Sequence, residues 1–419
     1  MMHTISETAT VTWSTFKKFA FRFSFIFIFS FILVFNNGTY PLYDYISKPL
    51  TDLMHWLTPW FSKNVLGYTY DYSIFVNGSG DTSYAWISLL ILLLLAFFAA
   101  VIWSILDLKR ENYNTLFYWL TTAIRYYIAF MLINYGTIKL LHAQMPPPSL
   151  NRLMQPLGEY SPMGLAWTFI GFSKGYNILL GIVEILSGLL FFRKTIVLGA
   201  LITIMTSINI MSINYFYDVP VKILSTMLFL FSLFLLLPFL QTLYSLFIKG
   251  DPGQLPFLQQ PIYNKNWKRK SILMAKILIL LFFAGQQIIS VIDTKKMMAQ
   301  YLKKPPFYGI YRIEKAEKDR KTIPHGWSLI IFEYDNNSVM VRDSAYKPHW
   351  ESIVMNNQAK KLTLNRYQFD YTINQNGDIL LSKVVEGNRE EVKLIKQDTQ
   401  QFELTKRRFN WIQEYPYNR

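Results

Sequence analysis

Residues 116–141 read LFYWLTTAIRYYIAFMLINYGTIKLL, and they form the first of four hydrophobic stretches that follow one another almost without a break as far as Ile248. Each stretch has about the 20 apolar residues that a helix needs to cross a bilayer. This region carries Arg125, Lys139, Glu184 and Asp218 at or inside the depth of a bilayer. A charge at membrane depth is costly, so each of the four is a candidate for a functional site.

The composition of the chain indicates an integral membrane protein. Of its 419 residues 52% are hydrophobic and 17% aromatic, and the apolar residues are gathered in blocks rather than spread at the spacing of a soluble core. The net charge of +15 arises largely beside these blocks, where basic residues set topology, so it does not indicate nucleic-acid binding. The absence of cysteine excludes disulfides and thiolate metal ligands.

Seven stretches are predicted to span the membrane. They are Phe19–Phe35, Tyr84–Leu106, Leu116–Leu141, Gly164–Phe192, Thr195–Tyr217, Val221–Ile248 and Ile272–Ile292. Basic residues at their ends fall on one side of the membrane if the spans alternate. The positive-inside rule then predicts a bacterial cytoplasmic (inner) membrane protein with a cytoplasmic N-terminus and a periplasmic C-terminal domain.

The blocks divide the chain into four parts. We expect N-terminal transmembrane helices over 1–115 with a periplasmic loop at 36–83, a four-helix core over 116–248, a cytoplasmic loop and the last span over 249–292, and a periplasmic β domain over 293–419. Within the loop, Leu50–Leu57 with Trp56 and Trp60 predicts a short helix lying in the membrane interface.

The last part has the pattern of an antiparallel β sandwich or small barrel. The predicted strands are Gly309–Glu314, Ser328–Tyr334, Ser338–Asp343, Lys361–Leu364, Tyr367–Ile373, Asp378–Val385, Glu391–Ile395 and Gln401–Leu404. They are short and regularly spaced, with turn residues between them. The fold class expected for the whole chain is therefore an all-α membrane bundle followed by a soluble β domain.

Helical geometry predicts an ion pair in the core. Small and polar residues form a stripe on each of three predicted helices, and these stripes should face one another. At 1.5 Å per residue, Arg125 and Glu184 lie roughly 13 Å and 12 Å from the cytoplasmic ends of their helices, at the same depth. Because an arginine can keep a buried carboxylate ionised, we expect an Arg125–Glu184 ion pair.

The same counting predicts a second polar layer nearer the outer face, in which Asp218 pairs with Lys139 or Lys222. Two interpretations stay open: the charges only lock the helices together, or they line a ligand pocket beneath the proline-rich segment that follows Gln144. On the second interpretation the candidate ligand-binding residues are Lys139, Asn214, Asp218, Lys222, Tyr135, His142, Gln144 and Trp167.

One short motif suggests chemistry that we do not expect. Gly78-Ser79-Gly80-Asp81 superficially matches the Gly-x-Gly-Asp of intramembrane aspartyl proteases, which need two aspartates that share a proton. Tyr217-Asp218 could supply the second carboxylate, but the two motifs come in the wrong order along the chain. Asp81 instead precedes a predicted span, where aspartate, threonine and serine cap helices.

Several motifs resemble those of DoxX-type membrane proteins. They are Arg125-Tyr126, Tyr135 through Lys139, Gln144 through Pro146, Pro162 through Trp167, Glu184 through Leu190 and Tyr217 through Lys222. Gly78–Thr82, Tyr308–Tyr311 and Trp411–Arg419 further resemble the longer form of Bacteroidota, in which extra helices and an extracytoplasmic domain flank the core. Because some DoxX-like proteins resemble a subunit of thiosulfate:quinone oxidoreductases, the resemblance implies a quinone or another isoprenoid as ligand.

Three functions are consistent with these residues. We favour an accessory or structural subunit that holds an envelope partner through its β domain, because the polar residues form no complete catalytic constellation. The alternative is a quinone- or isoprenoid-binding redox protein, in which Lys139, Asp218 and Lys222 polarise a carbonyl. Aromatic side chains such as Tyr135 and Trp167 would then stack on the ring. The third function is a small transporter, although no inverted repeat is evident.

The sequence carries no motif for a resident cofactor. With five histidines and no matched intramembrane pair of them, bis-histidine haem ligation is not expected. A quinone is the one cofactor that the resemblance suggests, and an enzymatic function would then be that of a quinone-linked oxidoreductase. Its electrons would come from the bound quinone or from a partner.

Overall fold

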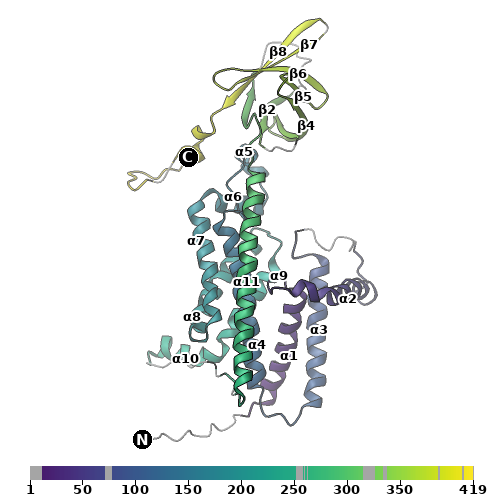
Figure 1. Ribbon diagram of the computed structural model, residues 1–419, viewed down its shortest axis with the longest axis vertical. Coiled ribbons are helices and arrows are strands. Elements are labelled where there is room, and N and C mark those ends of the chain that lie inside the picture. Colours follow the sequence, from purple (N-terminus) through teal and green to yellow (C-terminus); the bar gives the residue numbers. More distant parts are fainter. Residues whose placement is uncertain are drawn as a thin grey trace. The chain divides into compact units, whose positions relative to one another are not determined.

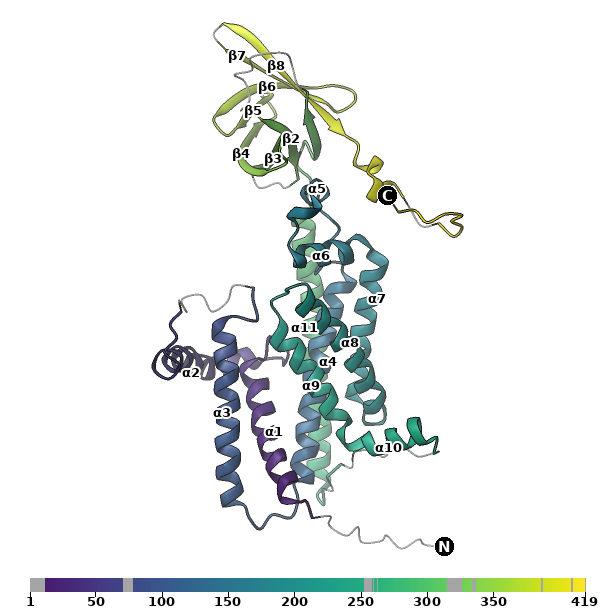
Figure 2. The ribbon, with the colours of Figure 1, turned by 180° about the vertical axis from the view of Figure 1, so that it is seen from behind.

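The computed structural model describes residues 12–70, 78–251, 258, 260–261, 263–314, 326–333, 337–385, 387–407 and 410–418. The chain folds into two compact units (Figures 1 and 2). The helical unit spans Met1–Met145 and Pro162–Thr294, and the barrel unit spans Pro146–Ser161 and Lys295–Arg419. The predicted β domain, residues 293–419, is thus joined by a segment from the middle of the predicted four-helix core.

The helical unit is built from long apolar helices. Its helices are α1 (Thr15–Val34), α2 (Tyr43–Asn64), α3 (Ser83–Leu106), α4 (Asn114–Leu140), α6 (Pro162–Phe172), α7 (Lys174–Ile185), α8 (Ile196–Phe216), α9 (Lys222–Leu236), α10 (Leu240–Tyr244) and α11 (Asn266–Tyr301), of which α11 continues into the barrel unit. Among the described residues, six helical segments are long and apolar enough to cross a membrane. The prediction of a helical membrane bundle is confirmed in this sense.

The first predicted span forms α1 but is not one of the six, because it carries three basic residues, Lys17, Lys18 and Arg22. Arg22 is buried, and its guanidinium donates hydrogen bonds at 2.8 Å to the hydroxyls of Tyr113 and Ser104 and to the carbonyl of Asp107. A buried charge held by several acceptors is tolerated. Arg22 therefore ties α1 to the segment that joins α3 to α4.

The predicted span Gly164–Phe192 is broken into three pieces. The helix α6 ends at Phe172, and Ser173 caps α7 by accepting a hydrogen bond from the backbone N–H of Tyr176 at 3.2 Å. After α7 the chain tightens into a 3₁₀ helix over Leu186–Phe191. A serine cap offers the backbone an alternative to a continuous helix, and the hydrophobicity of the stretch did not indicate this break.

The helix α2 runs across the direction of the other helices (Figures 1 and 2). It contains the helix predicted at Leu50–Leu57 but is longer, with 22 residues. Trp56 and Trp60 stack on each other with their ring centroids 6.2 Å apart, and both side chains are exposed. Amphipathic helices of this kind, with exposed tryptophans, are typical of membrane interfaces.

The helices α4 and α7 cross in very close contact. A Cβ atom added to Gly136 of α4 would lie 2.7 Å from the carbonyl oxygen of Gly181 of α7. Farther along, the Ser187 hydroxyl donates a hydrogen bond to the carbonyl of Ala129 at 3.4 Å. Residue numbers therefore fall along one helix as they rise along the other, so the two are antiparallel. Small residues at such crossings let backbones approach.

The barrel unit is a closed antiparallel barrel in which each strand pairs with the next and the last pairs with the first. The described strands are β1 (Gly309–Ile313), β2 (Trp327–Phe332), β3 (Ser338–Asp343), β4 (Pro348–Asn356), β5 (Lys361–Leu364), β6 (Tyr367–Ile373), β7 (Ile379–Val385) and β8 (Asn388–Gln397). Side chains such as Phe332, Phe369 and Leu381 fill its interior. Of the two predicted alternatives, a sandwich and a small barrel, the structure shows the barrel, and its interior is a packed core.

Two strand predictions differ from the structure. The strand β4 was missed, because it begins at Pro348 and exposes Trp350 and Val354 on its outer face, which obscures the usual alternation. The predicted strand Gln401–Leu404 is wrong: these residues lie in a 3₁₀ turn, Thr399–Gln401, and in the start of the short helix α12 (Glu403–Lys406). Tyr334, the last residue of another predicted strand, lies outside the described residues.

The segment Pro146–Ser161 covers one side of the barrel. Its short helix α5 (Leu150–Leu153) places Leu150, Leu153 and Met154 against the outward side chains of the first three strands. These outward side chains are Ile310, Leu329, Ile331 and Met340. The strands are therefore buried on both faces, which explains the continuous apolar run in β2.

A buried carboxylate fixes this segment. Glu333 accepts hydrogen bonds from the backbone N–H of Leu150 at 2.5 Å, the backbone N–H of Asn151 at 3.1 Å and the side-chain amide of Asn151 at 2.6 Å. Burial raises the pKa of the Glu333 carboxyl, and these hydrogen bonds oppose the rise. Arg342, also buried, lies 3.7 Å from the Glu159 carboxylate and so holds the other end of the segment.

The close crossing of α4 and α7 predicts a specific sensitivity. A methyl group on Gly136 meets a backbone oxygen, so the helices must move apart, and we expect Gly136→Ala to lower the free energy of unfolding by about 1–3 kcal/mol. Thermal unfolding of the detergent-solubilised protein measures this loss. Gly175→Ala is the matched control, because a Cβ atom there meets nothing within 4 Å. Equal stability of the two variants would contradict the crossing.

The hydrogen bonds to the Glu333 carboxylate lead to a prediction about how firmly the segment Pro146–Ser161 is held. In Glu333→Ala three N–H groups lose their acceptor, and a buried donor left unpaired costs about 1–3 kcal/mol. We expect faster hydrogen–deuterium exchange at the amides of Leu150 and Asn151 in the full-length protein. Glu391→Ala, which removes an exposed carboxylate from β8, is the control. Unchanged protection of the segment would show that another contact holds it.

Candidate functional site

The most deeply buried ion pair of the helical unit joins Lys139 to Glu184. The Lys139 Nζ atom donates to the Glu184 Oε1 atom at 2.6 Å, and the two side chains are only 7% and 3% exposed. Side chains on a helix lean toward its N-terminus. Because α4 and α7 are antiparallel, Lys139 and Glu184 lean toward each other across the Gly136–Gly181 crossing.

The predicted Arg125–Glu184 pair is wrong. Arg125 is buried, but its Nε atom donates to the carbonyl oxygen of Leu190 at 2.6 Å. The prediction assumed that the cytoplasmic ends of the two helices are level. The observed register instead places Arg125 beside the 3₁₀ helix that follows α7, and Glu184 about 9 Å farther along the axis. The main-chain carbonyls at this tightened end of the helix supply the acceptor.

The Lys139 cavity adjoins this pair, and five of the eight predicted ligand-binding residues line it. Its volume is about 190 Å³. The five are Tyr135, Lys139, Gln144, Trp167 and Asn214. They come from α4, the residues just after it, α6 and α8, and apolar side chains of α9 such as Leu224 and Leu228 close the cavity. The structure thus gathers residues from four helices around one small space.

The other three predicted residues lie elsewhere. Asp218 pairs with Lys222 at 3.0 Å, as one of the two predicted alternatives has it, but the Asp218 side chain is 82% exposed. His142 is buried, and its Nε2 atom lies 2.9 Å from the carbonyl oxygen of Gly171. The predicted outer layer is therefore split, because Lys139 turns inward to Glu184 while Lys222 turns to Asp218.

Asp81 has a role that the sequence did not reveal. Its two carboxylate oxygens accept the backbone N–H groups of Lys222 and Ile223, at 2.7 Å and 3.0 Å, at the start of α9. Asp81 thus caps α9, whereas Thr82 caps α3. The backbone N–H of Gly80 also donates to the carbonyl of Pro220 at 2.8 Å. The motif that resembles a protease signature is a structural clamp between two distant parts of the chain.

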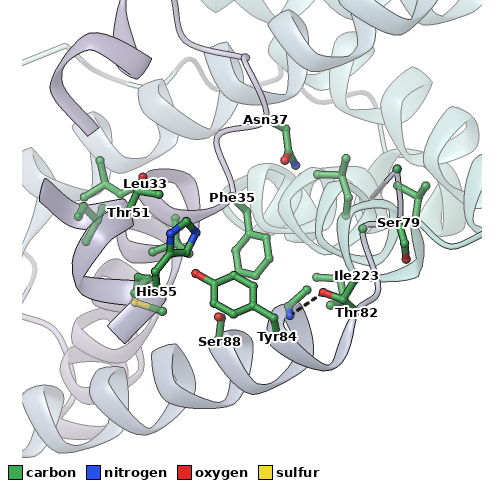
Figure 3. A pocket seen from close by; sticks show the side chains of 18 of the residues that line it. Leu33, Phe35, Asn37, Thr51, His55, Ser79, Thr82, Tyr84, Ser88 and Ile223 are labelled. Carbon is green, nitrogen blue, oxygen red and sulfur yellow. Dashed lines mark hydrogen bonds between the residues drawn. The ribbon is translucent and has the colours of Figure 1, made fainter. Parts of the chain in front are cut away.

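A second cavity of about 420 Å³ lies beside this clamp (Figure 3). His55 of α2 and Tyr84 of α3 lie next to each other in one wall of this cavity, with their ring centroids 5.6 Å apart. Nearby, the hydroxyls of Thr58 and Ser88 are 3.0 Å apart and fully buried. The sequence analysis missed these residues, because nothing in the chain pairs His55 with a residue 29 positions later.

The two cavities adjoin. Their shared lining residues are Gly78, Tyr135, Val221 and Leu224. Tyr135 also lines a third cavity, of about 570 Å³, between α4 and α11, where the Gln287 side chain donates to the Asn134 side chain. Tyr135 is thus placed where the polar spaces of the helical unit meet. The ammonium of Lys139 lies 5.7 Å from the centre of its ring.

The Lys139 cavity offers donors and acceptors to a ligand. Among the described residues the Lys139 ammonium donates to Glu184 alone, although an ammonium has three donors. Within the described part of the chain, the Glu184 Oε2 and Gln144 Oε1 atoms are buried and have no hydrogen-bond partner. Buried polar atoms of this kind are uncommon and call for a reason. Over the same residues no cluster of histidine, aspartate and glutamate suits a metal ion.

Comparison with known proteins places this chain beside a bacterial relative. It is similar to YwoB of Bacillus subtilis (strain 168), an uncharacterized protein, with 34% identity over 122 residues, which is 27% of this chain and 71% of YwoB. No family model and no solved structure matches the chain. At this identity, and with more than two thirds of YwoB covered, the chain belongs to the same protein family as YwoB.

Proposed function

We propose that the helical unit binds a lipid-soluble molecule with a carbonyl-bearing ring, of the quinone class or a related isoprenoid. The convergence of Tyr135, Lys139 and Trp167 on one buried cavity carries this proposal. Its volume of about 190 Å³ suits a single ring, since an apolar cavity of about 150 Å³ can bind benzene. We therefore now favour ligand binding over the accessory role that the sequence analysis favoured.

The chemistry of the lining supports a ring with a carbonyl group. The Lys139 ammonium can donate to a carbonyl oxygen while it keeps Glu184 as its counter-ion. The aromatic rings of Tyr135 and Trp167 can pack against the faces or edges of a ligand ring. The resemblance of this region to DoxX-type proteins points the same way. Reduction of a bound quinone would need electrons from a partner protein, and oxidation of a bound quinol would need a partner that accepts them.

The site suits a protein of the bacterial inner membrane. In this proposal the N-terminus is cytoplasmic and the barrel is periplasmic, which the basic residues near the ends of the helices support. A lipid-soluble ligand then reaches the cavity from the bilayer. Lys222 and Asp218, which pair with each other away from the Lys139 cavity, serve the fold rather than the ligand.

Quinone binding to the protein in lipid nanodiscs tests the proposal. We expect isothermal titration calorimetry to show that decylubiquinone binds the wild type, and that Lys139→Met weakens binding by about tenfold or more, because a hydrogen bond from a charged donor is lost. Lys174→Met, which removes an exposed lysine at the start of α7, should bind as the wild type does. Absence of binding to the wild type would overturn the proposal.

A second variant separates binding from folding. Lys139→Met alone leaves the Glu184 carboxylate buried without its partner, which is strongly destabilising. The double variant Lys139→Met/Glu184→Gln removes both charges and should recover most of the unfolding midpoint. We expect it still to bind the quinone weakly. Recovery of binding along with the fold would show that Lys139 is only structural.

We propose as a second function that the barrel holds a protein partner in the cell envelope. The barrel interior is filled, so only its outer surface is available for binding. On that surface Trp350 and Val354 of β4 are 55% and 62% exposed. They are four residues apart in the strand, so their side chains point to the same face. Exposed tryptophans are common at the centres of interfaces.

Native mass spectrometry of gently extracted protein tests this second function. We expect a stoichiometric partner on the wild type and its loss in Trp350→Asp/Val354→Asp, because charges at the centre of an apolar contact oppose binding. Val384→Asp is the control, since Val384 of β7 is also exposed. A wild type without a partner, or a partner retained by the double variant, would contradict the function.

A further inference from the structure

The Lys139 cavity is the inner end of a series of hollow spaces. It shares the walls formed by Gly78, Tyr135, Val221 and Leu224 with the cavity of Figure 3. The cavity of Figure 3 in turn shares Leu33 with a groove of about 560 Å³, which is a different space from the cavity between α4 and α11 that contains Gln287. The three spaces therefore follow one another, with Tyr135 at the first junction and Leu33 at the second.

The character of the walls changes along this series. The Lys139 cavity has a charged end, whereas none of the described residues that line the cavity of Figure 3 is Asp, Glu, Lys or Arg. Its lining combines apolar side chains, such as Phe35 and Met54, with uncharged polar ones, such as Asn37 and Ser79. This middle cavity suits an uncharged part of a ligand, with the His55 and Tyr84 side chains on one side only.

The groove at the far end is largely apolar, and Lys276 is the charged residue among its described lining residues. It lies between α1, the start of α2, α4 and α11, and its lining includes Ile32, Ile46, Tyr126 and Ile279. Over the described part of α11, which forms the outer wall, Phe283 is the buried side chain, and it stacks on Phe130 with the ring centroids 4.1 Å apart. In a membrane such a groove is in contact with lipid.

We infer that the ligand has a hydrocarbon tail, which runs from its ring in the Lys139 cavity past Tyr135, through the cavity of Figure 3 and past Leu33 into the groove. The walls change from the buried ion pair through a mixed, uncharged middle to a largely apolar groove, which matches an amphipathic molecule. A ring alone would leave the cavity of about 420 Å³ and the groove without a role. This inference rests on the proposed quinone-like ligand and extends it to a long-chain molecule that enters from the bilayer.

A bulky residue at the second junction tests the tail route. We expect Leu33→Trp to weaken the binding of decylubiquinone by about tenfold, because overpacking blocks the tail, and to change the binding of the tail-less ubiquinone-0 by less than about twofold. Leu53→Trp is the matched control, since Leu53 lies exposed on α2 and is not among the residues that line these three spaces. Thermal unfolding reports whether either variant is misfolded.

The outcomes separate the route from the site. Equal weakening of both quinones by Leu33→Trp, or no effect on either, would overturn the tail route and leave ring binding intact. Failure of the wild type to bind either quinone would overturn both proposals. If Leu33→Trp does not fold, a quinone with a photoreactive group at the end of its tail replaces it. Crosslinks to α1 or to residues 40–46 would support the route, and crosslinks only to α6 or α8 would overturn it.

Discussion

The contact between Gly136 and Gly181 is the constraint on which the polar centre of the helical unit depends. Without side chains at these two positions the backbones of α4 and α7 approach so closely that a methyl group cannot fit. The approach brings Lys139 within 2.6 Å of Glu184 and excludes water from both. Removing two charges from water costs several kcal/mol for each ion, of which good pairing returns a part. Helix packing therefore supports the ion pair, rather than the reverse.

Because helix packing supports the Lys139–Glu184 ion pair, the pair itself needs a role other than holding the helices together. Apolar residues of similar volume often stabilise a fold as well as a buried ion pair does, so the pair is not needed to hold α4 against α7. The Glu184 Oε2 atom, unpaired within the described part of the chain, would be a defect in a purely structural pair. An adjoining cavity with an aromatic wall gives both charges a reason to remain. Arg125, in contrast, donates to the main-chain carbonyl of Leu190 and is not among the residues that line the Lys139 cavity, so we assign it a structural role.

Hydropathy predicted most of the fold, because length and hydrophobicity determine which segments can cross a membrane and alternation determines which residues face a barrel core. It did not predict where helices end: Ser173 divides one predicted span, and a cap is a single hydrogen bond inside an apolar run. The site was predicted in part. Tyr135, Lys139, Gln144, Trp167 and Asn214 do meet, since polar residues at membrane depth tend to face one another.

The pairing within that site was beyond the reach of sequence. Counting residues from helix ends gives depth only if the ends are level, and the α7 end is not level with the start of α4. The predicted depth was wrong by about six residues, or roughly 9 Å. The prediction therefore named Arg125 as the partner of Glu184, whereas the observed partner is Lys139. Asp81 shows the same limit, because its acceptor role joins it to Lys222 and Ile223, 141 and 142 positions later. No local pattern encodes such a contact.

The segment Pro146–Ser161 links the two proposed functions through the covalent chain. It belongs to the barrel unit, held there by Glu333 and Arg342, yet its ends are bonded directly to Met145 and Pro162 of the helical unit. Their neighbours Gln144 and Met163 line the Lys139 cavity. In the proposed functions, the ligand cavity and the barrel are thus connected through residues next to both ends of this segment. If a partner on the barrel changes the affinity for the ligand, thermodynamic linkage requires the ligand to change the affinity for the partner by the same factor.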